Sequence, residues 1–518
     1  MLVFRLGRFY NNLSQGGRAR RWSLQTDTRV QYNLGKSVKQ YLVFTTISVR
    51  QYVSRISCCE HWISRCTMKN AFSRRRFIEQ TAVLGGALGA APLLAVQPAA
   101  EEHTPLKPIG KARGIYPGRV VWVHDPHVLD WQGPSDGRWY QGGRTRQDRV
   151  DAMLLRAVCE LTGQSKAADA WDKLFRHFNK ARGKDAGYSP GEKIAIKPNW
   201  VGMIWREGNV DPQTYRLIRR QDYMNTAPQM ILALLRQLTS IGVKHSDITV
   251  CDTLAYLVHE YYEILHGEFP DVQYVDYAGK FGRIQVKPSQ IPLYWSCRPQ
   301  GKLQDYIPTC FAEASYLINF AALKAHGATG VTLCGKNHFG SLIRWPVQQG
   351  YYDMHMHSFS RKTRLYREQV DLFGHEHLDG KTVLYLIDGL FSGKHPMDHL
   401  PRRFNLPPFS GNWPCSLLAS QDPVAIDSVG FDFLRSEFDD FPRRPGVDDY
   451  LHEAALAADP PSGTAYDPNN ATAQKRLASL GVHEHWNNPT ERKYSRNLST
   501  GEGIELVPVS LASRSAKG

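Results

Sequence analysis

The segment from Lys324 to Gly340 holds the densest group of side chains that could do chemistry. It contains two lysines, two histidines, an asparagine and four glycines. Glycines let backbone N–H groups approach a ligand, and lysines supply positive charge for a phosphate or carboxylate. Lys324 and Lys336 are therefore predicted to hold an anion, and His326 to act as a general base or a metal ligand. The alternative is a glycine-rich turn with solvated lysines.

Three further residues of this segment, Thr329, Gly330 and Asn337, are predicted to contact the same ligand. The spacing of the glycines matches neither a Walker A loop nor a dinucleotide-binding Gly-x-Gly-x-x-Gly motif. Cys334 has no evident activating partner in the sequence, and no Gly-x-Ser-x-Gly elbow is present. A hydrolase with a nucleophilic serine or cysteine is therefore not expected.

Polar residues also follow several predicted strands at the point where each strand ends. Lys197 and Asn199 follow one strand, Asp252 follows the next, and Asp388 and Asp422 follow two later ones. In an open parallel sheet, ligands bind beyond the carboxyl ends of the strands. Asp252 is thus a candidate for proton transfer or metal binding, and Lys197 and Asn199 for substrate binding. The alternative for each aspartate is that it caps the following helix.

Asp427 lies one turn inside an otherwise apolar helix start. A buried carboxylate is costly unless it is paired. The sequence therefore predicts that Asp427 pairs with a lysine of the site and contributes to substrate binding.

The elements that would position these residues alternate between short β-branched runs and helical patterns, which is typical of an α/β fold with a mostly parallel open sheet covered by helices. Thr226 and Asp422 are predicted as helix N-caps. Pro-, Gly- and aromatic-rich stretches at 105–145, 285–308, 344–360 and 395–415 are predicted to be long ordered loops. The predicted strands are Val120 to Val123, Lys193 to Ile196, Ile248 to Cys251, Val272 to Val275, Tyr316 to Phe320, Val383 to Ile387 and Ser416 to Ala419. The predicted helices are Gln147 to Leu161, Ala167 to Lys180, Ala227 to Ser240, Leu257 to Leu265, Val331 to Ile343 and Val424 to Glu437.

Metal or cofactor binding is a second possibility, although the sequence does not identify a cofactor. Besides His326 and Asp252, the pairs His355-Met-His357 and His375-Glu-His377 have the i, i+2 spacing that puts two imidazoles on one side of a strand. The nine cysteines include no Cys-x-x-Cys. A ferredoxin-type iron-sulfur cluster is therefore not expected.

Residues 68–100 have the order of parts of a twin-arginine export signal: Ser73-Arg-Arg-Arg-Phe-Ile78, then an uncharged Ala/Gly/Leu-rich run. The twin-arginine translocation machinery is the expected partner and the periplasm the expected location, with membrane attachment only if the signal stays uncleaved. Residues 1–67 precede the signal, so we expect translation to begin at Met68. A basic arm that binds nucleic acid is the alternative for residues 1–67.

The net charge of +15 belongs mostly to these upstream parts. Residues 1–67 carry 11 Lys or Arg and two acids, and residues 68–100 carry four and one, which leaves +3 for residues 101–518. This near balance gives no electrostatic reason to expect nucleic acid as a partner. Residues 101–518 are expected to form one α/β domain whose C-terminal segment wraps around it.

Five ordered motifs between about residues 193 and 437 resemble the bacterial domain of unknown function 362 family. They are Lys197-Pro-Asn199, Asp252-Thr253, Asn319 with Leu323-Lys324-Ala-His326, Thr329-Gly330-Val-Thr with Gly335-Lys336-Asn337 and Gly340, and Asp422-Pro-Val-Ala-Ile-Asp427. The resemblance implies an exported α/β protein but supplies no reaction. Some relatives carry an added ferredoxin-like domain, whose cysteines this chain lacks.

Three functions remain open from the sequence. The first is an enzyme acting on a small anionic substrate by lysine and histidine acid-base chemistry. The second is a metal- or cofactor-loaded redox protein that folds before export. The third is a periplasmic ligand-binding or accessory protein in which the same polar edge binds without reacting.

Overall fold

The computed structural model describes residues 107–511, apart from 205–208, 220–222, 297–304, 345–363, 396, 397 and 399. The predicted upstream extension, the export signal and the His355/His357 pair lie outside the described residues. Among the helices that are described, none is both long and apolar enough to cross a membrane.

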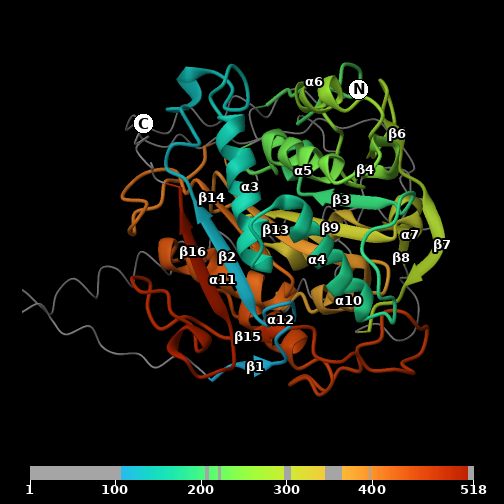
Figure 1. The fold of residues 1–518 in the computed structure, drawn as a ribbon, viewed down its shortest axis with the longest axis vertical. Coiled ribbons are helices and arrows are strands. Elements are labelled where there is room, and N and C mark those ends of the chain that lie inside the picture. The colour runs from blue at the N-terminus through green and yellow to red at the C-terminus, as the bar shows by residue number, and fades with distance from the viewer. Residues whose placement is uncertain are drawn as a thin grey trace, which may run out of the picture. The chain divides into compact units, whose positions relative to one another are not determined.

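A nine-stranded sheet forms the centre of the described part, in the order β16-β2-β14-β13-β9-β3-β4-β5-β6 (Figure 1). Every neighbouring pair is parallel except those of β14, which runs antiparallel to both β13 and β2. The carboxyl ends of the other strands therefore open at one edge, and that of β14 opens at the opposite edge. The strands are β2 (Arg119–His124), β3 (Ile194–Pro198), β4 (Ile248–Cys251), β5 (Gln273–Asp276), β6 (Ile284–Gln285), β9 (Tyr316–Ala322), β13 (Thr382–Gly389), β14 (Ser416–Ser420) and β16 (Glu505–Ser510).

Helices cover both faces of the sheet because its central strands are apolar on both sides. In β2, Val121 and Val123 pack into one hydrophobic cluster and Val120 and Trp122 into another. The first cluster contains α3 (Gln147–Thr162), α4 (Ala167–Lys180), α5 (Pro228–Ser240) and α6 (His259–Glu268). The second contains residues of α8 (Cys334–Asn337), α10 (Glu368–Gly374), α11 (Pro423–Glu437) and α12 (Pro445–Ala455).

The described part also contains smaller groups of paired strands and a short helix. A hairpin of β10 (Lys324–His326) and β11 (Gly330–Thr332) follows β9, and β1 (Ile109–Gly110) pairs with β15 (Val482–His483). A third small sheet has the order β12-β8-β7. These elements are β7 (Pro288–Leu293), β8 (Asp305–Pro308), β12 (Ile343–Arg344) and the short helix α7 (Thr309–Glu313).

The α/β prediction is confirmed, and all seven predicted strands are present within about two residues of their expected ends. Asp422 caps α11 as predicted, accepting from the N–H groups of Val424 and Ala425. The Thr226 prediction is wrong, because Thr226 Oγ1 accepts instead from Asn199 N and donates to Phe320 O. The carboxylate of Asp388 accepts from Ala227 N at the start of α5.

Two longer predictions are also corrected. The helix expected over Val331 to Ile343 is instead β11, the single turn α8, a 3-10 turn at His338–Gly340 and β12. Gly335 and Gly340 fall inside this stretch, where glycine weakens a helix. The loop expected at 285–308 contains β7 and β8.

Candidate active site

The parallel strands β3 and β4 bring Lys197 and Asp252 together at their carboxyl ends. Lys197 Nζ donates to Asp252 Oδ2 over 2.9 Å and to Asn337 Oδ1 over 3.1 Å. The lysine side chain is fully buried and that of Asp252 is 6% exposed. Removing either partner of a buried pair leaves an uncompensated charge, so the two residues depend on each other.

Asn337, at the end of α8, connects the pair to its surroundings through both ends of its amide. Its Nδ2 donates to Lys197 O over 2.9 Å and to Asn319 Oδ1 over 2.8 Å. Its Oδ1 accepts from Lys197 Nζ and from Asn199 Nδ2, the latter over 2.9 Å. All four hydrogen-bonding positions of the amide are used, which fixes its orientation.

Asp427 holds α8 in place from the neighbouring helix α11. Its two carboxylate oxygens accept from Cys334 N over 2.7 Å and Gly335 N over 2.9 Å, and Tyr450 OH donates to it over 3.2 Å. The predicted pairing with a lysine is therefore wrong: the carboxylate is satisfied by a helix N-terminus. Burial raises the pKa of Asp427 to about 7.

Lys324, the first residue of β10, contacts the side chain of Asn199. Its Nζ donates to Asn199 Oδ1 and to Met224 O, and the side chain is completely buried. Burial is the main cause that lowers its pKa well below the ordinary value. The charges of Lys336 and Lys197 lower it further, while Asp388 and Asp252 act in the opposite direction.

Asp388, at the carboxyl end of β13, lines the same crevice as Lys324 together with Trp139, Tyr223 and Phe391. Its carboxylate accepts from Ala227 N and Leu390 N, both over 2.8 Å. Burial raises its pKa to about 6. The crevice is too narrow to admit a water molecule, so Lys324 faces a dry, protein-lined space.

Lys336 belongs to α8 and is 7% exposed. Its Nζ lies 4.8 Å from the centre of the Phe339 ring. Its charge is the largest electrostatic influence on Lys324. Two of the predicted lysines, Lys197 and Lys336, therefore both act on the third, Lys324, and all three side chains are buried.

His326, Thr329 and Gly330 form the turn of the β10–β11 hairpin. His326 Nδ1 accepts from Ala328 N over 3.0 Å and Thr329 N over 3.3 Å, and Thr329 Oγ1 donates to Val331 O. Gly330 has a φ of 87°, and a Cβ there would lie 2.3 Å from Val447 Cγ2. These contacts give the three residues a role in the turn, and a role in ligand binding stays a prediction.

Gly340 packs directly on the ion pair. A Cβ at this position would lie 2.5 Å from Asp252 Oδ1 and 3.0 Å from Lys197 Nζ. Gly340 O also accepts from Thr253 N over 3.0 Å. The glycine is thus required by close approach to the carboxylate.

Asp422 does not join this group, although the sequence placed it at the same edge. It follows β14, the antiparallel strand, and therefore lies at the opposite edge. There it accepts from Arg113 N and Val482 N in addition to the N–H groups of α11. Burial raises its pKa to about 6.

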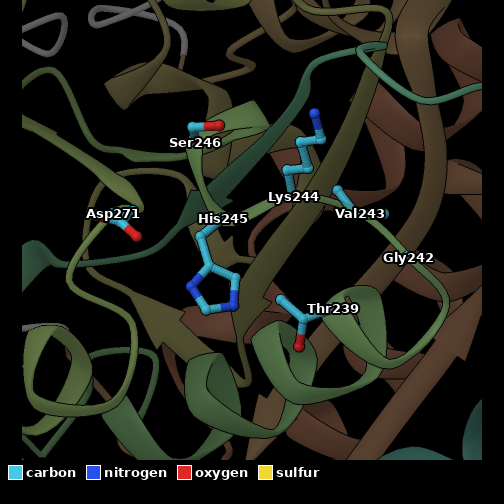
Figure 2. A pocket seen from close by; sticks show the side chains of 7 residues that line it. All are labelled: Thr239, Gly242, Val243, Lys244, His245, Ser246 and Asp271. Atoms are coloured by element: carbon cyan, nitrogen blue, oxygen red, sulfur yellow. The ribbon is translucent and has the colours of Figure 1, made fainter.

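A surface pocket of about 640 Å³ also lies away from the polar edge (Figure 2). It is lined by the end of α5 and by the segments just before β4 and β5, so it opens at the amino ends of these strands. Its charged side chains come from Lys244 and Asp271, with His245 between them in the view. The pocket contains none of the predicted site residues.

Among the residues that the structure describes, the predicted metal ligands do not form a group of three or more. His375 uses both ring nitrogens, one toward Pro292 O and one accepting from His377 N. Within the described part of the chain, the group of three potential ligands that lie close together is Asp448, His483 and His485. It includes neither His326 nor Asp252, and metal binding by these two stays a prediction.

The sequence did not predict a role for the Met224 carbonyl or the Asn319 side chain. Met224 O accepts from Lys324, and Asn319 orients Asn337. A backbone acceptor leaves no signal in residue type. Asn319 could have been found, since it is a polar residue inside the fully buried strand β9.

Residues 194–432 match the model of a family described as "Domain of unknown function (DUF362)". This match agrees with the resemblance seen in the motifs, and it covers Lys197, Asp252, Lys324, Lys336 and Asp427. No curated protein matches the chain.

Proposed function

We propose that the polar edge around Lys324 is the active site of an enzyme that acts on a small anionic substrate. The observation that supports this is the state of Lys324, which is fully buried with a strongly lowered pKa. A lysine in such surroundings loses its proton more readily than an exposed lysine, and the neutral amine can act as a general base or a nucleophile. Lys324 is thus the residue proposed to react.

The hydrogen bonds of Lys324 fit the neutral form. A neutral amine has two N–H donors and one lone pair, and Lys324 donates to two acceptors, Asn199 Oδ1 and Met224 O. The lone pair is then available to take a proton from the substrate, which turns the amine into an ammonium group. The nearby carboxylate of Asp388 opposes the lowering of the pKa and would stabilise that ammonium group.

The other lysines supply the preference for an anion. Lys336 and Lys197 both disfavour a third positive charge at Lys324, so a bound carboxylate or phosphate would relieve this repulsion. We assign anion binding mainly to Lys336, because its charge is the largest electrostatic influence on Lys324. Asp252 and Asn199 would orient groups of the substrate.

The narrow crevice limits the size of the ligand. Since the space beside Lys324 does not admit water, a substrate can reach the amine only if side chains that line the crevice, such as Tyr223 and Met224, move aside. Exclusion of water strengthens electrostatic interactions inside a site. This arrangement supports a small substrate that reacts in a dry environment.

The test measures binding and turnover of small carboxylates and phosphates by the wild-type protein and by Lys324→Met and Lys336→Ala. Lysine ¹³Cε chemical shifts, followed against pH, report which lysine is neutral. We expect Lys324→Met to fold and bind an anion without turning it over, and Lys336→Ala to lose binding. Turnover that persists in Lys324→Met, or a charged Lys324 at pH 8, would contradict the proposal.

A carrier is the second candidate, because the complete burial of Lys324 also suits a site that encloses a ligand. In that case a small anion would bind, binding would be lost in Lys336→Ala, and no turnover would be found in the wild type. A redox protein with a metal at His326 and Asp252 is the remaining alternative. A near-stoichiometric metal that is lost in His326→Ala would favour it.

Export by the twin-arginine pathway is also proposed. Its support is the sequence of residues 68–100, with Arg74, Arg75 and Arg76 before the uncharged run. Changing Arg74, Arg75 and Arg76 to lysine should keep the protein in the cytoplasm of a host with a working pathway. Continued export of the triple variant would contradict the proposal.

A further inference from the structure

Three side chains outside the Lys324 site lie close together in the C-terminal part of the chain. Asp448 belongs to α12, His483 to β15, and His485 follows β15. One potential ligand atom from each lies within 4.8 Å of the others, and both histidines are buried. His485 Nε2 and Asp448 Oδ1 are 3.0 Å apart.

The hydrogen bonds of His483 leave one of its nitrogens with a lone pair. Ser428 Oγ donates its single hydrogen to Val424 O over 2.7 Å. Ser428 Oγ also lies 2.8 Å from His483 Nδ1. Because the serine hydrogen is already used, the imidazole N–H at Nδ1 must be the donor of this hydrogen bond. In a neutral imidazole with a proton on Nδ1, Nε2 is free to bind a metal.

His485 is held in a similar way by Asp432 of α11. Its Nδ1 lies 2.8 Å from Asp432 Oδ1, while its Nε2 faces Asp448. A carboxylate that receives the Nδ1 proton and turns Nε2 toward the ion is the usual outer contact of a metal-bound histidine. Asp432 is itself fixed by Tyr494 OH over 2.9 Å and Trp486 N over 2.9 Å.

We propose that Asp448, His483 and His485 bind a divalent transition metal ion of the zinc type. Two imidazoles and one carboxylate form a ligand set that suits Zn²⁺, Co²⁺ or Ni²⁺ better than Ca²⁺ or Mg²⁺. A fourth position is open to water or to His452, an exposed residue whose ring centre lies 4.9 Å from that of His483.

The distances require only a small adjustment. Two ligand atoms about 2.1 Å from a tetrahedral metal are about 3.4 Å apart, against the present separations of 3.0 Å to at most 4.8 Å. The Asp448 side chain is 44% exposed and can shift toward His483 without disturbing the core. The bound ion would join α12 to β15, and α11 would support it through Ser428 and Asp432.

The competing state is a metal-free one in which a proton occupies the site. Burial lowers the pKa of His485, but the carboxylates of Asp432 and Asp448 outweigh it and raise the value to about 9. Arg435 lies 3.1 Å from Asp432 and adds positive charge nearby. An ion must therefore displace the proton from His485.

The experiment uses purified protein freed of metal with a chelator and then titrated with Co²⁺ alone at pH 8, with calorimetry and visible absorption as readouts. We expect one Co²⁺ per chain with the absorption of a four- or five-coordinate ion. Affinity should fall at least tenfold in His483→Ala and in Asp448→Asn, whereas His245→Ala, a histidine of the remote surface pocket, should bind as the wild type.

Asp448→Asn keeps a hydrogen-bonding group beside His485, so it decides the matter if His483→Ala does not fold. The proposal is overturned if the wild type takes up no Co²⁺, since the cluster is then only a proton-bridged one. Uptake that is equal in the wild type and Asp448→Asn also overturns it, because the ion then lies elsewhere.

Discussion

Replacing Gly340 by alanine tests whether the Lys197–Asp252 pair organises the site. The backbone at Gly340 does not have the positive φ that alanine would resist, so the only penalty comes from the added methyl group. That methyl group would lie 2.5 Å from Asp252 Oδ1 and 3.0 Å from Lys197 Nζ. The variant therefore presses directly on the ion pair.

The size of the effect follows from that overlap. Asp252 Oδ1 must move by roughly 0.9 Å to reach an ordinary contact distance, while its partner oxygen now lies 2.9 Å from Lys197 Nζ. Overpacking of this kind costs about 1–3 kcal/mol. If the pair separates and leaves a buried charge, the cost rises to about 3–5 kcal/mol.

The assay is the free energy of unfolding from denaturant titration, with Gly267→Ala as the matched control. Gly267 is an exposed residue of α6, and a Cβ there meets nothing within 4 Å. Alanine in an exposed helix should stabilise the protein by about 0.5–1 kcal/mol. We expect Gly340→Ala to be destabilised by at least about 1 kcal/mol and to lose anion binding. Equal stability of the two variants would refute the reasoning.

Three other changes give distinct outcomes. Asn337→Asp places an oxygen where the amide now donates to the Lys197 carbonyl and to Asn319 Oδ1. The variant should lose about 2 kcal/mol or more of unfolding free energy. A variant as stable as the wild type would mean that the amide is oriented differently. In Asp427→Asn, the single amide oxygen can accept from only one of the two N–H groups of α8. The variant should lose about 1–3 kcal/mol of unfolding free energy and bind the anion more weakly. Unchanged anion binding would mean that α8 does not contribute to the site. The pKa of Lys324 is lowered well below 10.5 in the folded protein. Between this lowered pKa and 10.5, the unfolded chain binds a proton that the folded protein lacks, so the free energy of unfolding rises with pH in that range. Lys324→Met should reduce this slope by up to about 1.4 kcal/mol per pH unit, and an unchanged slope would show that the amine is charged.

The central sheet could be predicted from the sequence because its strands are runs of β-branched and apolar residues with polar residues at their ends. β9 illustrates this, since all seven of its residues are buried. The direction of β14 could not be predicted in this way. The residue pattern of a buried strand is the same whether the strand runs parallel or antiparallel to its neighbours. Only the pairing with β2 and β13 shows that Asp422 lies at the opposite edge.

The segment after β10 was mispredicted for a different reason. Val331 to Ile343 contains helix-forming residues, but the single turn α8 is held by the carboxylate of Asp427 from another helix. A cap that is distant in sequence leaves no local signal. For the same reason, the sequence indicated that Asp427 must be satisfied but could not identify its partner.

The three His-x-His pairs show where spacing alone stops being informative. His355/His357 lies outside the described residues, and His375 uses both of its ring nitrogens within its own surroundings. His483-Glu-His485 has the same spacing but was not singled out from the sequence. What distinguishes this pair is the set of partners from two helices, with Ser428 and Asp432 on α11 and Asp448 on α12. Since α11 also supplies Asp427 to the Lys324 site, a single helix positions the residues of both proposed sites. Loss of metal should therefore reduce hydrogen-exchange protection in β15 and the end of α11 before that of β3 or β4, and uniform loss across the sheet would contradict a local metal site.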